Sequence, residues 1–404
     1  MKKILLIILD GLGDRPSPEL GNRTPLQAAN KKNINALASR GMVGLFEPIS
    51  PGIRPGSDTA HLSILGYDPY KVYTGRGPFE ALGLGMDLKP GDIAFRGNFA
   101  TVDKNLKVID RRAGRIDTGT DKLASSLNIE IDGINIMVKE GVEHRAGVVF
   151  RGDGLSPNVS DVDPHQENVF VQASKPLDNG AKKTAEVLNK FTKKSYEILD
   201  QHPVNIERKK QGKNPANILL TRGAGIVPKL DNFNEKYGLK SACVVGVPLI
   251  SGICKLAGII PIMVPGATGT TNTNMQNKVK YAIDAFKTYD FLLMNIKATD
   301  VAGHDGNAML KKQMIEKADI ALEPILDLLD EITVMITGDH STPCTVKDHT
   351  GDPLPVLIST KGIRSDGIEE WNEISASRGS LRITGRDVIN VLLNYSDRAE
   401  KFGA

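Results

Sequence analysis

Three short hydrophobic runs in this chain each lead to an acidic residue. They are ILLIILD, which ends at Asp10, FLLMNIKATD, which ends at Asp300, and ITVMITGDH, which ends at Asp339 and His340. Runs of this length, closed by a polar residue, are typical of buried parallel strands. Because ligands of open α/β sheets bind outside the carboxyl ends of the strands, the pattern predicts a site that gathers negative charge there. Clustered carboxylates repel one another, and a metal ion is their natural partner.

The order of the predicted elements favours two domains, as a length of 404 residues does. Strands and helices alternate in residues 1–92 and again in 229–404, which predicts one discontinuous α/β domain with a doubly wound, mostly parallel sheet. Residues 93–228 read as an inserted, smaller α+β domain with a helix over 179–200. Its predicted strands lie in the segments DIAFRGNFATVD, LKVIDRRAGRI, INIMVKEG, RAGVVFRGDG, NVFVQASKP and ANILLTRGAG.

Charge and composition exclude several classes of partner. The formal net charge of +3 predicts neither nucleic-acid nor membrane binding, and a single tryptophan, Trp371, argues against a stacking surface for bases. Three widely spaced cysteines, Cys243, Cys254 and Cys344, favour reduced thiols in a cytoplasm over a disulfide framework. The apolar run before Asp10 is better interpreted as a first strand than as a signal peptide. The oligomeric state stays open.

Histidines and one serine accompany the three acids. Of the seven histidines, His304, His340 and His349 fall within 46 residues, and His304 follows Asp300 by four in a segment interpreted as a Gly-containing loop. Mixed Asp and His ligands suit Zn²⁺ or Mn²⁺, and the number of candidates suits two ions, which act about 4 Å apart in phosphoryl transfer. Ser57 lies between Gly56 and Asp58, at or just before the first turn of a predicted helix, and is the candidate nucleophile.

Each feature also has a simpler interpretation. A single aspartate at a strand end is commonly a helix N-cap, and a serine after Pro-Gly is commonly part of a turn. His61 lies one helical turn after Ser57 and either supports the site or packs in the core. The hypothesis of a metal site therefore depends on the joint occurrence of these residues.

Five segments carry a resemblance to a known family. LDGLGDRP, PGSDTAHLSILGYDP, KATDVAGHDG, TGDHSTP and KDHTGDPLPV resemble the archaeal type of 2,3-bisphosphoglycerate-independent phosphoglycerate mutase, in the alkaline phosphatase superfamily. The likeness covers nearly the whole chain. It implies an alkaline-phosphatase-like fold and the interconversion of 3-phosphoglycerate and 2-phosphoglycerate in glycolysis and gluconeogenesis. It also implies a phosphoserine intermediate at Ser57 and no 2,3-bisphosphoglycerate cofactor.

The resemblance further implies two divalent ions, Mn²⁺, Zn²⁺, Co²⁺ or Mg²⁺. One would be held by Asp10, Ser57, Asp339 and His340, and the other by Asp300, His304 and His349. The family's inserted domain closes over a small phosphorylated carboxylate and supplies basic residues to it. Arginine suits that role because its planar fork binds carboxylate and phosphate in bidentate fashion, although any one of these arginines is also typical of solvated surface. The candidates are Arg111, Arg145, Arg151, Arg222 and, beside Asp300, Lys297.

One departure and three rivals remain. Related sequences tend to carry lysine where this chain has Ser251, and Lys255 stands four residues on. The metal motifs equally fit a metal-dependent phosphomonoesterase or another phosphomutase, such as a phosphopentomutase. A catalytically silent paralogue is the third alternative, which Ser251 favours and the complete set of seven ligands disfavours.

Overall fold

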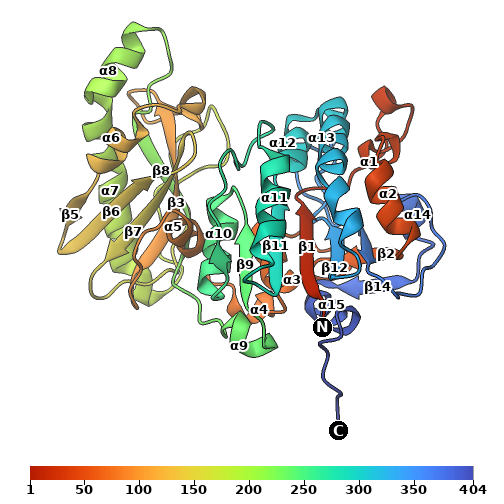
Figure 1. The fold of residues 1–404 in the computed structure, drawn as a ribbon. Helices are drawn as coiled ribbons and strands as arrows, with labels where there is room; N and C mark the ends of the chain where they lie inside the picture. The colour runs from red at the N-terminus through yellow and green to blue at the C-terminus, as the bar shows by residue number, and fades with distance from the viewer. Residues whose placement is uncertain (404) are drawn as a thin grey trace. The chain divides into compact units, whose positions relative to one another are not determined.

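The computed structural model describes residues 1–403, which separate into two compact units (Figure 1). Unit 1 consists of residues 1–72 and of the chain from 230 onward, and unit 2 consists of residues 73–229. The domain limits expected from the sequence, at residues 92 and 228, stay a prediction, because compactness does not test whether either part folds alone.

Unit 1 is built on a sheet of eight strands within the described residues, in the order β10-β9-β11-β1-β12-β13-β2-β14. Every neighbouring pair is parallel except the two pairs made by β13, so the predicted α/β class with a mostly parallel sheet is confirmed. The strands are β1 Lys3–Leu9, β2 Met42–Glu47, β9 Ser241–Val244, β10 Ile260–Pro261, β11 Phe291–Ile296, β12 Ile332–Thr337, β13 Leu354–Ser359 and β14 Leu381–Thr384.

The middle of this sheet explains why the three apolar runs are apolar throughout. β1 lies between β11 and β12, and β11 and β12 are buried along their whole length. Strands covered on both faces need continuous hydrophobic sequence rather than alternation. The register pairs Leu9 with Ile296, and Ile8 with Thr337, so the three strands end at one edge of the sheet.

Helices connect and cover these strands (Figure 1). They are α1 Pro25–Ala28, α2 Lys32–Ser39, α3 Ser57–Ile64, α4 Pro69–Val72, α9 Phe233–Tyr237, α10 Pro248–Leu256, α11 Met275–Ala285, α12 Ala298–Asp305, α13 Ala308–Ala321, α14 Glu373–Ala376 and α15 Val388–Tyr395. α13 ends at Ala321, and a 3₁₀ turn follows over Glu323–Asp327. Pro324 accounts for the break, because it lacks the N–H that an α-helix needs. None of the helices in residues 1–403 has the length and apolar character that spanning a membrane would require.

Unit 2 contains an antiparallel sheet in the order β4-β3-β7-β6-β5, and β8 also pairs with β3. Its core joins Phe95 and Phe150 of the sheet to Phe191 of the long helix α7. The strands are β3 Ile93–Val102, β4 Val108–Asp110, β5 Ile129–Ile131, β6 Ile134–Glu140, β7 Arg145–Arg151 and β8 Ile218–Gly225. The helices are α5 Gly77–Gly83, α6 Thr120–Ser125, α7 Lys182–Asp200 and α8 Pro203–Lys210.

The strand predicted at NVFVQASKP was wrong. Residues 168–176 form only isolated bridges, from Phe170 to Lys107 and from Pro176 to Val159. Strand preference reflects packing against neighbours, and Phe170 here is largely exposed.

Candidate active site

The three strand-end acids do meet at one edge of the sheet in unit 1. Asp10 directly follows β1, and Asp339 follows β12 by two residues. The turn after β1 needs Gly11, which has φ +64° and where a Cβ would lie 2.7 Å from the Asp300 side chain. The Gly11 N–H donates to Asp339 Oδ1 at 3.0 Å, so the backbone of one strand end orients the carboxylate of another.

Asp300 and His304 lie on a helix, not on the predicted loop. β11 ends at Ile296 and α12 begins at Ala298, so the two side chains are one helical turn apart. The error came from Gly303, which reads as a loop residue. In the structure it is the site of a close approach, because a Cβ there would lie 2.4 Å from the Thr342 carbonyl oxygen.

Ser57 is the first residue of α3, which confirms its predicted position at a helix N-terminus. Its side chain is buried, and its Oγ lies 3.0 Å from His340 Nε2 and 3.4 Å from Lys297 Nζ. His61, one turn along the same helix, is fully buried, and its Nδ1–H donates to the Ser57 carbonyl at 2.7 Å. His61 therefore supports the first turn of α3, and its Nε2 has no hydrogen-bond partner among the described residues.

Two groups of side chains have the geometry of a metal site. Asp10, Asp339 and His340 bring one ligand atom each to within 4.8 Å of one another, and so do Asp300, His340 and His349. His304 stands beside the second group, with its Nε2 3.5 Å from Asp300 Oδ1.

The histidines present the same ring nitrogen to the acids. Nδ1 of His304 lies 3.0 Å from the Lys347 carbonyl oxygen, and Nδ1 of His349 lies 2.8 Å from that of Pro55. A carbonyl only accepts, so in both rings Nδ1 carries the proton and Nε2 keeps its lone pair. Both Nε2 atoms face Asp300, at 3.5 and 3.8 Å. Metal-binding histidines are typically oriented in this way.

The charge balance of the site also fits a cation. Three buried carboxylates, Asp10, Asp300 and Asp339, face the ammonium group of Lys297. Lys297 lies between β11 and α12 and donates to Asp10 Oδ1 at 2.7 Å, with Asp300 Oδ2 also at 2.7 Å. One oxygen of Asp339, Oδ2, has no hydrogen-bond partner among residues 1–403. A donor set of carboxylates and imidazoles with unbalanced charge suits a divalent ion.

The pKa values follow from burial and from these charges. Burial opposes ionisation of Asp300, yet the Lys297 ammonium and the neighbouring imidazoles together hold the pKa of that carboxyl well below its usual range. Asp339 is farther from a cation, so burial and the Asp10 carboxylate raise its pKa to about 6. Burial lowers the pKa of His340 to about 4 and that of His349 to about 4, so both rings are neutral ligands at neutral pH.

The predicted arginines of unit 2 fall into two kinds. Arg111 binds Asp163 through Nε and Nη2 at 3.0 and 2.6 Å, and Arg151 binds Asp92 in the same way at 3.0 and 2.7 Å. Their guanidinium forks are therefore occupied. Nε of Arg145 and Nε of Arg222 are buried and have no hydrogen-bond partner among the described residues.

Arg145 and Arg222 belong to a cluster that the sequence analysis missed. On β3, Arg96 pairs in register with Arg222 of β8, and Asn98, two residues along the same face, pairs with Arg145 of β7. Helix α5 packs against these strands and brings Glu80, 3.8 Å from Arg76, to the same guanidinium groups. Burial lowers the pKa of Arg96, and Arg76 lowers it further. We call Arg76, Arg96, Arg145 and Arg222 the arginine cluster; a charged residue inside the apolar strand AFRGNF was the available signal.

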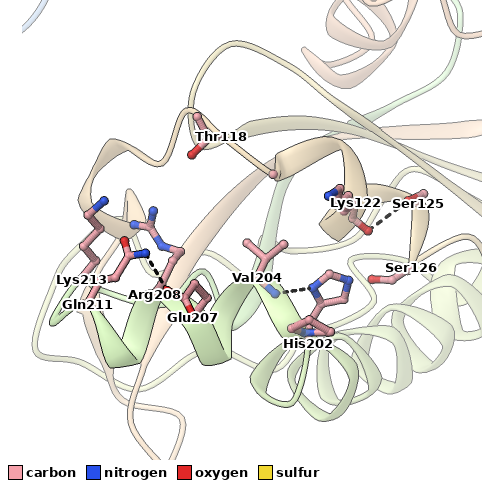
Figure 2. A pocket seen from close by; sticks show the side chains of 12 residues that line it. Thr118, Lys122, Ser125, Ser126, His202, Val204, Glu207, Arg208, Gln211 and Lys213 are labelled. Atoms are coloured by element: carbon pink, nitrogen blue, oxygen red, sulfur yellow. Dashed lines mark hydrogen bonds between the residues drawn. The ribbon is translucent and has the colours of Figure 1, made fainter.

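A cavity of unit 2 lies elsewhere. It measures about 830 Å³ and is lined by residues of α6, of α8 and of the segments beside them, among them Lys122, His202 and Arg208 (Figure 2). Arg208 donates to two backbone carbonyls, and no residue of the arginine cluster lines the cavity. The cavity is therefore separate from the residues that the sequence singled out.

The fold and the site together define a class of protein. It is an α/β protein in which a buried serine hydroxyl lies beside acids and histidines suited to divalent ions.

Comparisons with known proteins identify the family. Residues 38–205 match the family described as 2,3-bisphosphoglycerate-independent phosphoglycerate mutase. A protein of that name from Thermoplasma volcanium is 57% identical, with 100% of this chain and 99% of that protein covered. The solved cofactor-independent phosphoglycerate mutase from Thermoplasma acidophilum is 45% identical, with a TM-score of 0.71 over 98% of this chain and 100% of its own. A solved protein from Pyrococcus horikoshii is 42% identical, with a TM-score of 0.87 over 100% of this chain and 99% of its own. The chain belongs to the family of 2,3-bisphosphoglycerate-independent phosphoglycerate mutases and is an enzyme of that class.

Proposed function

We propose that this chain interconverts 3-phosphoglycerate and 2-phosphoglycerate through a phosphoserine at Ser57. The observation that carries the proposal is the Ser57 hydroxyl, 3.0 Å from His340 Nε2, at the start of a helix and beside the converging acids. Membership of the mutase family supports the substrate and the absence of a 2,3-bisphosphoglycerate cofactor.

The proposal includes two divalent ions, Mn²⁺, Zn²⁺, Co²⁺ or Mg²⁺. Asp10, Asp339 and His340, with Ser57, would hold one ion, and Asp300, His304 and His349 the other. The unbalanced carboxylates and the Nε2 lone pairs of His304 and His349 support this division. Such ions would supply positive charge to the serine oxygen and to the transferring phosphoryl group.

The chemistry requires two phosphoryl transfers. Ser57 Oγ attacks phosphorus, so the Oγ–P bond forms as the bond from phosphorus to O3 of glycerate breaks. The serine proton ends on the departing oxygen. The bound glycerate reorients, its O2 hydroxyl attacks the phosphoserine, and a proton returns to Oγ. Two in-line displacements predict net retention of configuration at phosphorus.

We further propose that the arginine cluster binds the anionic groups of the substrate. The guanidinium groups of buried Arg96 and of half-buried Arg76, Arg145 and Arg222 act on one buried carboxylate, that of Glu80, so an additional anion would offset their mutual repulsion. Lys297, already 3.4 Å from Ser57 Oγ, would contact the phosphoryl group. Arg111 and Arg151 would instead hold the fold, because Asp163 and Asp92 fill their forks. Three free, buried cysteines support a reducing, cytoplasmic location.

An enolase-coupled assay without added 2,3-bisphosphoglycerate tests the function. The unaltered chain should form 2-phosphoglycerate from 3-phosphoglycerate and should lose turnover in the presence of a chelator. Release of inorganic phosphate without 2-phosphoglycerate would instead make the chain a phosphomonoesterase. Formation of neither product would make it a silent paralogue.

Ser57→Ala tests the nucleophile. Removal of Oγ should abolish turnover, by about 10⁴-fold or more, because no other group can accept the phosphoryl. Folding and metal binding should persist. Ser63→Ala removes another buried hydroxyl from the same helix and is the matched control, with turnover expected to stay near normal. Turnover by Ser57→Ala close to that of Ser63→Ala would reject Ser57 as the nucleophile.

A further inference from the structure

The side chain of Thr342 lies between the two groups of candidate metal ligands. Its Oγ1 donates to Asp300 Oδ1 at 2.8 Å and lies 3.0 Å from His340 Nδ1. Thr342 is fully buried, so no water competes for its hydroxyl. It is the one side chain joined by hydrogen bonds both to Asp300, in one group, and to His340, which is shared by both groups, among the described residues.

The direction of these hydrogen bonds fixes the proton on His340. A hydroxyl has one proton, and Thr342 gives it to the Asp300 carboxylate. The contact with His340 can then form only if Nδ1–H donates to Oγ1, which leaves the lone pair on Nε2. That atom lies 3.0 Å from Ser57 Oγ, 3.6 Å from Asp10 Oδ1 and 3.3 Å from Asp339 Oδ2.

We propose that Thr342 is a positioning residue: it directs the Nε2 lone pair of His340 toward the group of Asp10 and Asp339, and it orients the carboxylate of Asp300 in the other group of ligands. This inference rests on the metal centre of the proposed function. Backbone carbonyls orient His304 and His349, but a carbonyl only accepts and so passes no hydrogen bond on to a ligand of the other group. A hydroxyl both accepts and donates, so Thr342 ties the ligands of one ion to those of the other.

The surrounding structure holds Thr342 in place. Lys311, buried in α13, donates to the carbonyl oxygens of Thr342 and Gly13 at 3.0 and 3.1 Å and to Asp14 Oδ2 at 2.8 Å. This buried ion pair fastens the segment after β12 to the turn after β1. Two glycines make room for Thr342: a Cβ on Gly11 would lie 2.7 Å from Oγ1, and one on Gly303 would lie 2.9 Å from Cγ2.

Calorimetric titration of Mn²⁺ into the metal-stripped full-length chain tests the proposal. Thr342→Val keeps the shape but removes the hydroxyl, and it should weaken Mn²⁺ binding by about 10- to 100-fold, as the loss of outer-shell partners typically does. Thr342→Ser keeps the hydroxyl and should bind nearly as the unaltered chain does. Thr333→Val is the matched control, because it removes a buried hydroxyl from β12 that donates to the Tyr395 carbonyl and, among the described residues, to no candidate metal ligand.

A second measurement depends neither on metal nor on a variant that folds. Long-range ¹⁵N–¹H spectra of the metal-free, histidine-labelled chain report which nitrogen of His340 carries the proton, and Nδ1 is expected. Protonation on Nε2 would overturn the inference, as would unchanged Mn²⁺ affinity in Thr342→Val or an equal loss in Thr342→Ser. If the unaltered chain takes up no Mn²⁺, the proposed metal centre fails, whereas the spectra still decide the role of Thr342.

Discussion

Lys278 is a buried lysine with almost nothing to balance its charge. It lies on α11, is fully inaccessible to solvent, and donates to the Asn295 carbonyl at 2.8 Å. Burial lowers its pKa from 10.5 to about 8, against an opposing contribution from Asp10. The unfolded state therefore binds more protons between pH 8 and 10.5, and stability rises with pH across that window.

Lys278→Met should remove this pH dependence. The free energy of unfolding of the unaltered chain, minus that of the variant, is expected to rise by about 2 kcal/mol from pH 7 to 9.5. Urea unfolding at a series of pH values measures it. Lys280→Met, on the exposed face of the same helix, is the control and should show a flat difference. A flat difference for Lys278→Met as well would mean that its ammonium is solvated in the folded chain.

Single residues could be predicted from the sequence where their chemistry is unusual for their position. Asp10 and Ser57 stood out because a carboxylate after an apolar run, or a serine before a helix, suggests a function even without a fold. Thr342 did not stand out, because a threonine is ordinary anywhere. Its role exists only through the distances to His340 and Asp300, which the pairing of distant strands determines.

At the scale of elements, strand pairing brings together residues that are distant in the sequence, as in the arginine cluster. Arg96, Arg145 and Arg222 are far apart in sequence and reach one face because β7 and β8 pair with β3 on either side. The strands themselves could be predicted from their apolar pattern, but their pairing could not. Gly303 is a similar case, because it suggested a loop from the sequence. In the structure it lies in helix α12, where it packs closely against Thr342.

Arg222→Gln should weaken substrate binding rather than folding. Loss of a charge-assisted hydrogen bond costs about 1.5–3 kcal/mol, so KM for 3-phosphoglycerate should rise by roughly 10- to 100-fold. Removal of one of several crowded cations should leave the melting temperature unchanged or higher. Arg151→Gln is the matched control: it leaves the buried carboxylate of Asp92 unpaired, so it should lower the melting temperature and leave KM nearly unchanged. The reverse pattern would move substrate binding to Arg151.

At the scale of the whole molecule, the candidate metal ligands are far apart in the sequence but close together in the fold. Asp10 and Ser57 lie before unit 2 in the chain, and Asp300, Asp339 and His349 lie after it. They meet because β1 inserts between β11 and β12, a long-range pairing that the strand pattern permits but does not specify. The strand pattern could thus predict that acids gather at a sheet edge, and the family resemblance implied their division into two groups. The distances between their ligand atoms required the structure.

The location of every candidate ligand in unit 1 leads to a prediction about the stability of the whole chain. A ligand that binds only the folded state stabilises it by about 2.7 kcal/mol at a concentration 100-fold above its Kd. Addition of Mn²⁺ to the metal-stripped chain should therefore slow hydrogen exchange by up to about 100-fold in β1, β11 and β12. Peptides from β3, β7 and α7 should be unaffected, because no candidate ligand lies in residues 73–229. Mass spectrometry resolves the two sets, and Asp300→Asn, which weakens one ligand, should reduce the protection of unit 1 alone. Equal protection of unit 2 would mean that the chain opens as one cooperative body, and no protection anywhere would contradict metal binding at the sheet edge.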